Sequence, residues 1–214
     1  MSYVEINKRY TKLAEDICCL SCGGAINFTE PQRGEICVDL GSGRGTDVLR
    51  LAEKVGQDGF VYGIDVSEGM LKKSQSSAEK LEIKNVKFIK AELEELPIEE
   101  RSVDMVISNC TINHAADKQK VWNEVARILK NGGRFVVSDI FSSETVPEEY
   151  KKDPQAVAEC WGGAVTKDVY LSQLKRAGFK EIEIIEESQP YDKGKIKVSS
   201  FTIRGRISNS CCSK

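Results

Sequence analysis

The chain has 214 residues, 31 basic and 33 acidic side chains, and a formal net charge of −2. This length favours one domain with a large core, and the absence of a basic block argues against nucleic acid or an anionic membrane as a partner. No apolar run approaches the roughly 20 residues of a membrane span, and residues 1–8 lack a signal-peptide core. We therefore expect a cytoplasmic protein.

The first elements in chain order are a helix, a loop and a buried strand. Apolar positions at helical spacing predict a helix over residues 2–16, whereas glycines and a proline make residues 18–35 a loop. The apolar run 36–40 predicts a strand, which passes through the glycine-rich turn 41–45 into a helix over residues 46–55.

Strands and helices alternate through the rest of the chain. The remaining expected strands cover residues 60–64, 86–90, 103–108, 134–139, 181–187 and 195–204. The remaining expected helices cover residues 68–81, 117–130 and 166–177. Asn131-Gly132-Gly133 would end the second of these helices, residues 142–165 would be irregular, and residues 205–214 would form a loose tail. The order predicts a doubly wound α/β fold, with an antiparallel pair of strands at one sheet edge.

Ligands of such sheets bind beyond the carboxyl ends of the strands, near the point where the strand order reverses. That rule gathers the glycine turn, Asp65, residues 91–92 and Asn109-Cys110 around one crevice.

The glycine turn has the spacing Gly41-x-Gly43-x-Gly45. Glycine allows positive φ angles and lets a ligand lie against the backbone. The spacing differs from the dinucleotide fingerprint, and no Lys-Ser/Thr pair follows, which excludes a triphosphate loop. Asp65 ends the second strand, where an acid can hold ribose hydroxyls or simply begin a helix. Glu92 can reach a purine edge or belong to a solvated acidic stretch.

Four motifs together resemble the class I methyltransferases that use S-adenosylmethionine: Val38-Asp39-Leu40-Gly41-Ser42-Gly43-Arg44-Gly45, Gly63-Ile64-Asp65-Val66-Ser67-Glu68-Gly69-Met70, Leu96-Pro97 and Leu129-Lys130-Asn131-Gly132-Gly133. The resemblance implies a Rossmann-like seven-stranded sheet with an antiparallel last strand. It implies that Asp65 holds the ribose, that the adenine lies near Met70 and Glu92-Leu93, and that the glycine turn meets the methionine part. The cofactor-binding residues implied are Asp39, Gly41, Ser42, Gly43, Asp65, Val66, Met70, Glu92, Leu93 and Asn109.

Eight cysteines are many for a protein of a reducing compartment, where thiols, ligands or redox groups are more usual than disulfides. Cys19 and Cys22 form a single Cys-x-x-Cys, and His114 is the only histidine, so a zinc site is not indicated. Cys37 lies inside a strand and is expected to be a small buried hydrophobe. Cys110 follows the fourth strand and should face the methyl donor. Cys160 is next to Trp161-Gly162-Gly163, which suggests a close-packed turn or a buried structural thiol.

Three thiolates from different segments suit a soft, three-coordinate thiophile such as arsenic(III). Arsenic bound by three sulfurs keeps a lone pair that can attack the sulfonium methyl in line. Such a transfer needs little acid–base chemistry and mostly positioning, which can supply on the order of 7–11 kcal/mol.

The sequence is similar to the arsenite methyltransferases in particular. Ser108-Asn109-Cys110-Thr111-Ile112-Asn113, Glu159-Cys160-Trp161-Gly162-Gly163-Ala164 and Cys22-Gly23-Gly24 resemble that family's three cysteine motifs. The resemblance implies that Cys22, Cys110 and Cys160 are catalytic and bind arsenic, and that Cys18-Cys19 deliver it. Arsenite or its thiol conjugates would be the substrate, and thioredoxin or glutathione the reductant.

Two features depart from that family. The chain ends soon after the last strand, so we expect one domain over residues 1–205, with a Cys-rich N-terminal segment (1–35), a tail (206–214) and no C-terminal domain. His114 stands where the family usually has an aliphatic residue, and it would line the site or tune Cys110. Cys211-Cys212 could exchange electrons with the site or be solvated passengers.

Two other functions are compatible with parts of this pattern. A carbon or oxygen methyltransferase of the quinone or sterol type would not need Cys110 and Cys160. An arsenic-binding protein without turnover would need the cysteines but not the glycine turn and Asp65.

Overall fold

The computed structural model describes residues 7, 8, 10–12 and 24–208. Residues 7, 8 and 10–12 are helical, in agreement with part of the expected N-terminal helix. The rest of that expected helix lies outside the described residues. So do five cysteines of the predicted or possible site, which are Cys18, Cys19, Cys22, Cys211 and Cys212.

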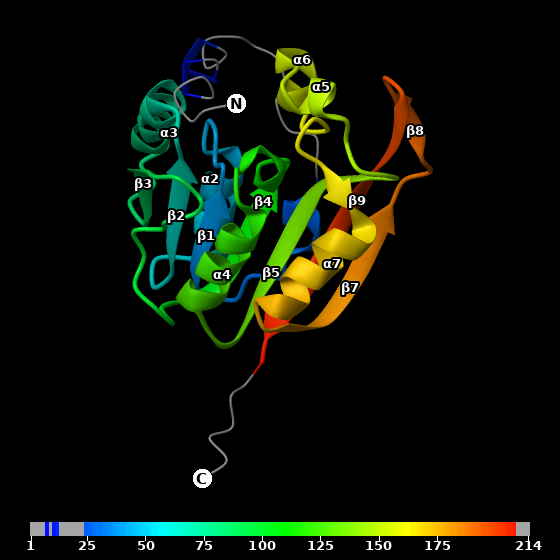
Figure 1. Cartoon of the computed structure of the whole chain (residues 1–214). Helices are drawn as coiled ribbons and strands as arrows, with labels where there is room; N and C mark the ends of the chain where they lie inside the picture. Colours follow the sequence, from blue (N-terminus) through cyan, green and yellow to red (C-terminus); the bar gives the residue numbers. More distant parts are fainter. Residues whose placement is uncertain (1–6, 9, 13–23, 209–214) are drawn as a thin grey trace.

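One sheet with the order β3-β2-β1-β4-β5-β9-β7 forms the centre of the molecule (Figure 1). Its strands are β3 (Val86–Lys90), β2 (Phe60–Asp65), β1 (Ile36–Leu40), β4 (Val103–Asn109), β5 (Leu129–Ser142), β9 (Ile196–Ile207) and β7 (Phe179–Glu187). The short strands β6 (Val165–Thr166) and β8 (Tyr191–Lys193) pair with β5 and β9. The first five strands in this order are parallel, and β9 is antiparallel to both β5 and β7. The expected fold is therefore confirmed.

Helices cover both faces of the sheet. They are α2 (Thr46–Val55), α3 (Glu68–Lys80), α4 (Lys118–Ile128), α5 (Glu148–Lys151), α6 (Pro154–Ala158) and α7 (Lys167–Arg176), with 3-10 turns η1 (Ala25–Phe28) and η2 (Ile112–His114). Figure 1 shows α4 and α7 side by side across one face and α2 behind the sheet, while α5 and α6 lie beyond its upper end. Among the described helices none has the length and hydropathy needed to cross a membrane.

Alternate residues of β1 enter two separate cores. Val38 and Leu40 pack in the cluster beneath α4 and α7, whereas Cys37 packs in the cluster beneath α2. This alternation follows from the two-residue period of a strand. Burial raises the pKa of the Cys37 thiol to about 12, so Cys37 is an inert core residue as the sequence predicted.

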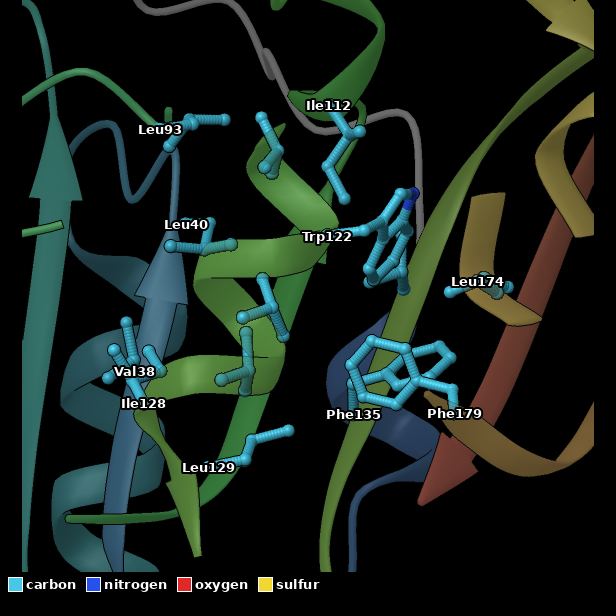
Figure 2. Packing of buried hydrophobic residues seen from close by; sticks show 14 of the residues in the cluster. Val38, Leu40, Leu93, Ile112, Trp122, Ile128, Leu129, Phe135, Leu174 and Phe179 are labelled. Atoms are coloured by element: carbon cyan, nitrogen blue, oxygen red, sulfur yellow. The ribbon is translucent and has the colours of Figure 1, made fainter. Parts of the chain in front are cut away.

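Trp122 is the largest fully buried side chain of the main core, and it contacts Phe135, Tyr170 and Phe179 (Figure 2). We expect Trp122→Ala to lower the free energy of unfolding by about 3–5 kcal/mol, since it leaves a large cavity. Because the indole Nε1 has no hydrogen-bond partner among the described residues, Trp122→Phe should cost much less. Urea denaturation of both variants checks this, with Val169→Ala on the exposed side of α7 as the control.

The end of α4 differs from the prediction. The helix ends at Ile128, and residues 129–133, which were expected to include its last turn and stop signal, begin β5. Leu129 pairs with Val103 of β4, and Lys130 Nζ lies 2.7 Å from an oxygen of Asp104. Strand pairing therefore prevails over local helix propensity, and β5 is longer than the predicted strand 134–139.

Two further boundaries were wrong. Residues 142–165 are not wholly irregular, because Asp153 caps the short helix α6 by accepting hydrogen bonds from the Gln155 and Ala156 N–H groups. Residues 205–207 belong to β9 rather than to a tail, since Gly205 and Arg206 pair with β5. The long antiparallel pairing with β5 and β7 carries the strand past the predicted end.

Candidate active site

The glycine turn joins β1 to α2 and has the predicted left-handed backbone. The φ angles of Gly41, Gly43 and Gly45 are 72°, 51° and 79°. The Gly41 and Ser42 N–H groups both donate to the carbonyl of Ile64 at the end of β2, 2.8 and 3.0 Å away. These bonds fix the turn at the carboxyl ends of the two strands.

Gly41 also brings the turn against the segment that carries Cys110. A Cβ atom at Gly41 would lie 2.0 Å from Oγ1 of Thr111, so only glycine permits this approach. Thr111 directly follows Cys110, and its hydroxyl donates to the Asn109 carbonyl. The two halves of the predicted site are thus in contact.

Asp65 closes the turn from the side of β2. Its carboxylate accepts hydrogen bonds from the Gly43 N–H and the Ser67 N–H, both 2.8 Å long. Burial raises the pKa of Asp65, while these two backbone donors oppose the shift. The side chain therefore holds the turn in place, and this is the position from which the sequence predicts a grip on ribose.

Three carboxylates surround the turn. Asp39 is the next-to-last residue of β1 and Asp47 lies in the first turn of α2. Burial raises the pKa of both groups, as it does for Asp65. The Asp39 pKa is raised further by the charges of Asp47 and Asp65. A cationic ligand would relieve this repulsion, which suits the sulfonium and ammonium groups of S-adenosylmethionine.

The turn also has room and a polar atom for a ligand. Ser42 Oγ is buried and has no hydrogen-bond partner among the described residues. A Cβ atom at Gly43 would meet nothing within 4 Å, so this residue faces open space. A buried hydroxyl without a partner is costly unless a ligand or water completes it. The residues present therefore fit S-adenosylmethionine.

The residues predicted to lie near adenine are on neighbouring segments. Glu92 and Leu93 follow β3, which pairs with β2. A hydrogen bond from the Ala91 N–H to the Asp65 carbonyl extends this pairing by one residue. Leu93 is buried and Glu92 is exposed. Val66 is half-buried, whereas Met70 is only 1% exposed and offers almost no surface to a ligand in this conformation. The adenine contacts stay predictions.

Cys110 and Cys160 meet although 50 residues separate them. The Cys160 thiol donates to the Cys110 carbonyl, with Sγ and O 3.0 Å apart. Both residues belong to one buried cluster between the end of β5 and the 148–164 segment. The structure thus brings together two of the three predicted cysteines.

Both cysteines have a left-handed backbone, with φ angles of 52° at Cys110 and 66° at Cys160. The other described non-glycine residues with positive φ, Glu82, Arg101 and Glu181, are exposed. A left-handed non-glycine residue costs of order 1–3 kcal/mol and often marks a functional site. Of the five described non-glycine residues with this backbone, the two buried ones are therefore the two cysteines that contact each other.

His114 lies in η2 and contacts the Cys160 thiol. Its Nε2 is 3.4 Å from Cys160 Sγ and 3.1 Å from the hydroxyl of Tyr10. His114 therefore lines the site, as one of the two predictions for it proposed, and it links the N-terminal helical residues to Cys160.

Asn109 connects three segments near Cys110. Its Nδ2 donates to Asp47 on α2, and its Oδ1 accepts from the Ala25 N–H, with distances of 2.8 and 3.1 Å. The side chain is thus engaged within the protein, and a contact of Asn109 with the cofactor stays a prediction. Ala25 begins η1, one residue after the start of the described range 24–208.

Asp139 is buried beside the cysteine segments, near the end of β5. Burial raises its pKa to about 7, against an ordinary value of 3.8, while hydrogen bonds and the cations His114 and Lys118 oppose the shift. The phenol of Tyr170 also faces it, and the pKa of Tyr170 is raised by burial and by Asp139. The folded protein therefore favours the neutral carboxyl more than the unfolded chain does.

This shift predicts a pH dependence of stability. The stabilisation from neutral Asp139 is complete below about pH 4 and is lost as the pH rises to about 7. We expect the difference in free energy of unfolding between wild type and Asp139→Asn to fall by on the order of 4 kcal/mol across that range. Denaturant titrations at several pH values measure it, and a difference independent of pH would contradict the assignment.

Sequence reasoning missed Asp47, Asn113 and Asp139. Asp47 resembles an ordinary acid in the first turn of a helix. The signal for Asp139 is an acid at the end of an otherwise apolar strand, which needs a buried partner. That partner is Asn113, and only the fold reveals the pairing.

A family model described as "Methyltransferase domain" matches residues 31–178. The chain belongs to this methyltransferase family, and the predicted cofactor, S-adenosylmethionine, is confirmed.

Within that family, the chain is similar to arsenite methyltransferases. It is 37% identical over 170 residues to the one from Halobacterium salinarum, which covers 79% of this chain and 44% of that protein. It is 39% identical over 160 residues to the human one, which covers 70% and 43% of the two chains. The predicted similarity to arsenite methyltransferases is therefore confirmed. The chain spans less than half the length of these curated relatives.

A solved structure shows the same likeness. The arsenic(III) S-adenosylmethionine methyltransferase from Chlamydomonas reinhardtii matches 95% of this chain and 73% of its own, with a TM-score of 0.72 and 28% identity.

Proposed function

We propose that the protein transfers a methyl group from S-adenosylmethionine to arsenic(III) held by the thiolates of Cys22, Cys110 and Cys160. The contact between the Cys160 thiol and Cys110, beside the glycine turn, is the observation that carries this proposal. Two buried cysteines in contact next to the donor site suit a thiophilic acceptor. The likeness to arsenite methyltransferases supports the same substrate.

The third thiol is proposed from chain reach. The Ala25 N–H is bound to Asn109, the residue before Cys110. Cys22 lies three positions before this anchor, so the two residues can be at most about 11 Å apart. Cys19 lies six positions before Ala25, so the anchor restricts the position of Cys19 less than that of Cys22. The anchor therefore favours Cys22 as the third ligand.

The proposed chemistry uses the protein mostly for positioning. S-adenosylmethionine supplies an electrophilic methyl group on a sulfonium. Asp65 and the glycine turn orient this donor, and the cysteines hold arsenic so that its lone pair faces the methyl carbon. The carbon–arsenic bond uses the lone pair, and the electrons of the broken carbon–sulfur bond stay with sulfur. Arsenic passes from trivalent to pentavalent in this step.

The change in valence supports a role for a reductant. Two electrons must return to arsenic before it can be methylated again, and thiols supply them by forming a disulfide. We include thioredoxin or glutathione in the proposal for this reason. The proposed chemistry needs Cys110 and Cys160 in the thiol form, which favours a reducing compartment and supports the cytoplasm as the location.

The test is anaerobic incubation of the protein with arsenite, S-adenosylmethionine and a thiol, followed by chromatographic speciation of arsenic. We expect methylated arsenic and an equal amount of S-adenosylhomocysteine. Tight arsenite binding without methylated product would instead favour an arsenic-binding protein. Activity on a quinone-type acceptor that survives Cys110→Ser and Cys160→Ser would favour the carbon or oxygen methyltransferase.

A further inference from the structure

The residues three positions after Cys110 and Cys160 touch each other. These are Asn113 in η2 and Gly163 in the 148–164 segment. A Cβ atom at Gly163 would lie 1.9 Å from the carbonyl oxygen of Asn113 and 3.0 Å from its carbonyl carbon. Only a residue without a side chain allows this approach, so the two cysteine segments are held backbone against backbone.

Asn113 is fixed on its other side by β5. Its Nδ2 donates to Asp139 Oδ1 and to the Ile140 carbonyl, at 2.8 and 2.9 Å, and its N–H donates to Asp139 Oδ2 at 3.2 Å. Both side chains are at most 3% exposed. Hydrogen bonds to a charged or polar group in such a buried place are geometrically demanding, because an unmade bond is costly.

Lys118 lies next to the same contact. Its Nζ donates to the Ala115 carbonyl at 3.2 Å and would be 3.7 Å from a Cβ atom at Gly163. Asp139 and Lys118 attract each other electrostatically across this buried region. Lys118 thus lies against the contact between the two cysteine segments.

We propose that Asp139, Asn113 and Gly163 form a positioning clamp that sets the separation of the Cys110 and Cys160 thiols for a trivalent ligand. This inference rests on the proposed function for the identity of the ligand. The Cys160 thiol itself contacts the Cys110 carbonyl and His114. The three clamp residues act by fixing the backbone of each cysteine segment three residues beyond the cysteine.

The clamp can be tested by chemical bridging, without arsenic. In a background with Cys18, Cys19, Cys22, Cys211 and Cys212 changed to Ser, dibromobimane reports on the remaining site thiols, because it becomes fluorescent when each of two thiolates displaces one bromide. Cys37 is buried in the core and is therefore out of reach of the reagent.

The variants are Gly163→Ala, which must separate the two cysteine segments by about 1 Å, and Asn113→Ala, which removes the hydrogen bonds of the Asn113 side chain. The matched controls are Ser143→Ala and Asn131→Ala, both at exposed positions.

We expect both clamp variants to slow bridging on the order of tenfold or more, since a displacement of about 1 Å strongly affects a positioned reaction. S-adenosylhomocysteine affinity, measured by calorimetry, should stay within about twofold of the background protein. Bridging within twofold of the controls in both variants would overturn the clamp. Parallel loss of bridging and S-adenosylhomocysteine binding in both variants would also overturn it, because the residues would then support the whole fold.

The same variants separate the clamp from the proposed function. If slowed bridging accompanies a protein that never methylates arsenite, the clamp stands and the proposed function falls. If the wild type methylates arsenite and bridging is unaffected in the variants, the function stands and the clamp falls.

Discussion

Cys110→Ser and Cys160→Ser are each expected to lower the rate of arsenite methylation by at least about 100-fold. A serine hydroxyl is a hard, protonated ligand that does not replace a thiolate on a soft centre. Loss of one ligand also misplaces the arsenic lone pair, and a displacement of about 1 Å can cost on the order of 100-fold. Timed speciation of arsenic at saturating arsenite measures the effect.

The control for this prediction is Cys37→Ala. Cys37 is a fully buried thiol in β1 that packs beneath α2, so its loss should cost stability but leave the methylation rate near that of wild type. S-adenosylhomocysteine binding should persist in all three variants, because the glycine turn and Asp65 are intact. A serine variant with undiminished methylation would show that its thiol does not hold arsenic.

Asp65→Ala is expected to weaken S-adenosylhomocysteine binding by about 100-fold or more. The substitution removes the acceptor of the Gly43 and Ser67 N–H groups, and it removes the proposed ribose ligand. Each hydrogen bond to a charged group contributes about 1.5–3 kcal/mol, and 1.4 kcal/mol corresponds to tenfold in affinity. Isothermal titration calorimetry provides the measurement.

Asp58→Ala in the exposed turn before β2 is the matched control, and its affinity should equal that of wild type. Arsenite binding by Asp65→Ala should also be close to wild type, because the thiols are on other segments. If Asp65→Ala bound S-adenosylhomocysteine as tightly as Asp58→Ala, Asp65 would hold the turn without contacting the donor.

The sequence was informative where chemistry is local. The glycine turn and Asp65 are recognisable because positive φ angles and a carboxylate at a strand end leave direct marks on residue type. Cys110 and Cys160 are recognisable because each lies in a distinctive short motif. The parallel sheet covered by helices on both faces also follows from the alternation of elements, since parallel strands need crossover connections.

The rest depended on long-range pairing. The predicted end of α4 was wrong because Leu129 pairs with Val103 and Lys130 forms an ion pair with Asp104. Neither partner can be recognised from the sequence around residues 129–130. The contact of Gly163 with Asn113 joins segments 50 residues apart, and the tether from Asn109 to Ala25 spans 84. These contacts set the geometry of the site, so its residues were easier to predict than their arrangement.

The central claim is that thiol-bound arsenic accepts the methyl group, and a single-turnover experiment tests it most directly. The protein is loaded anaerobically with one equivalent of arsenite, freed of excess thiol, and mixed with one equivalent of S-adenosylmethionine. The account predicts that methylated arsenic and S-adenosylhomocysteine form together in a one-to-one ratio. It would be contradicted if the loaded protein left S-adenosylmethionine unchanged, or if S-adenosylhomocysteine formed while all the arsenic stayed inorganic.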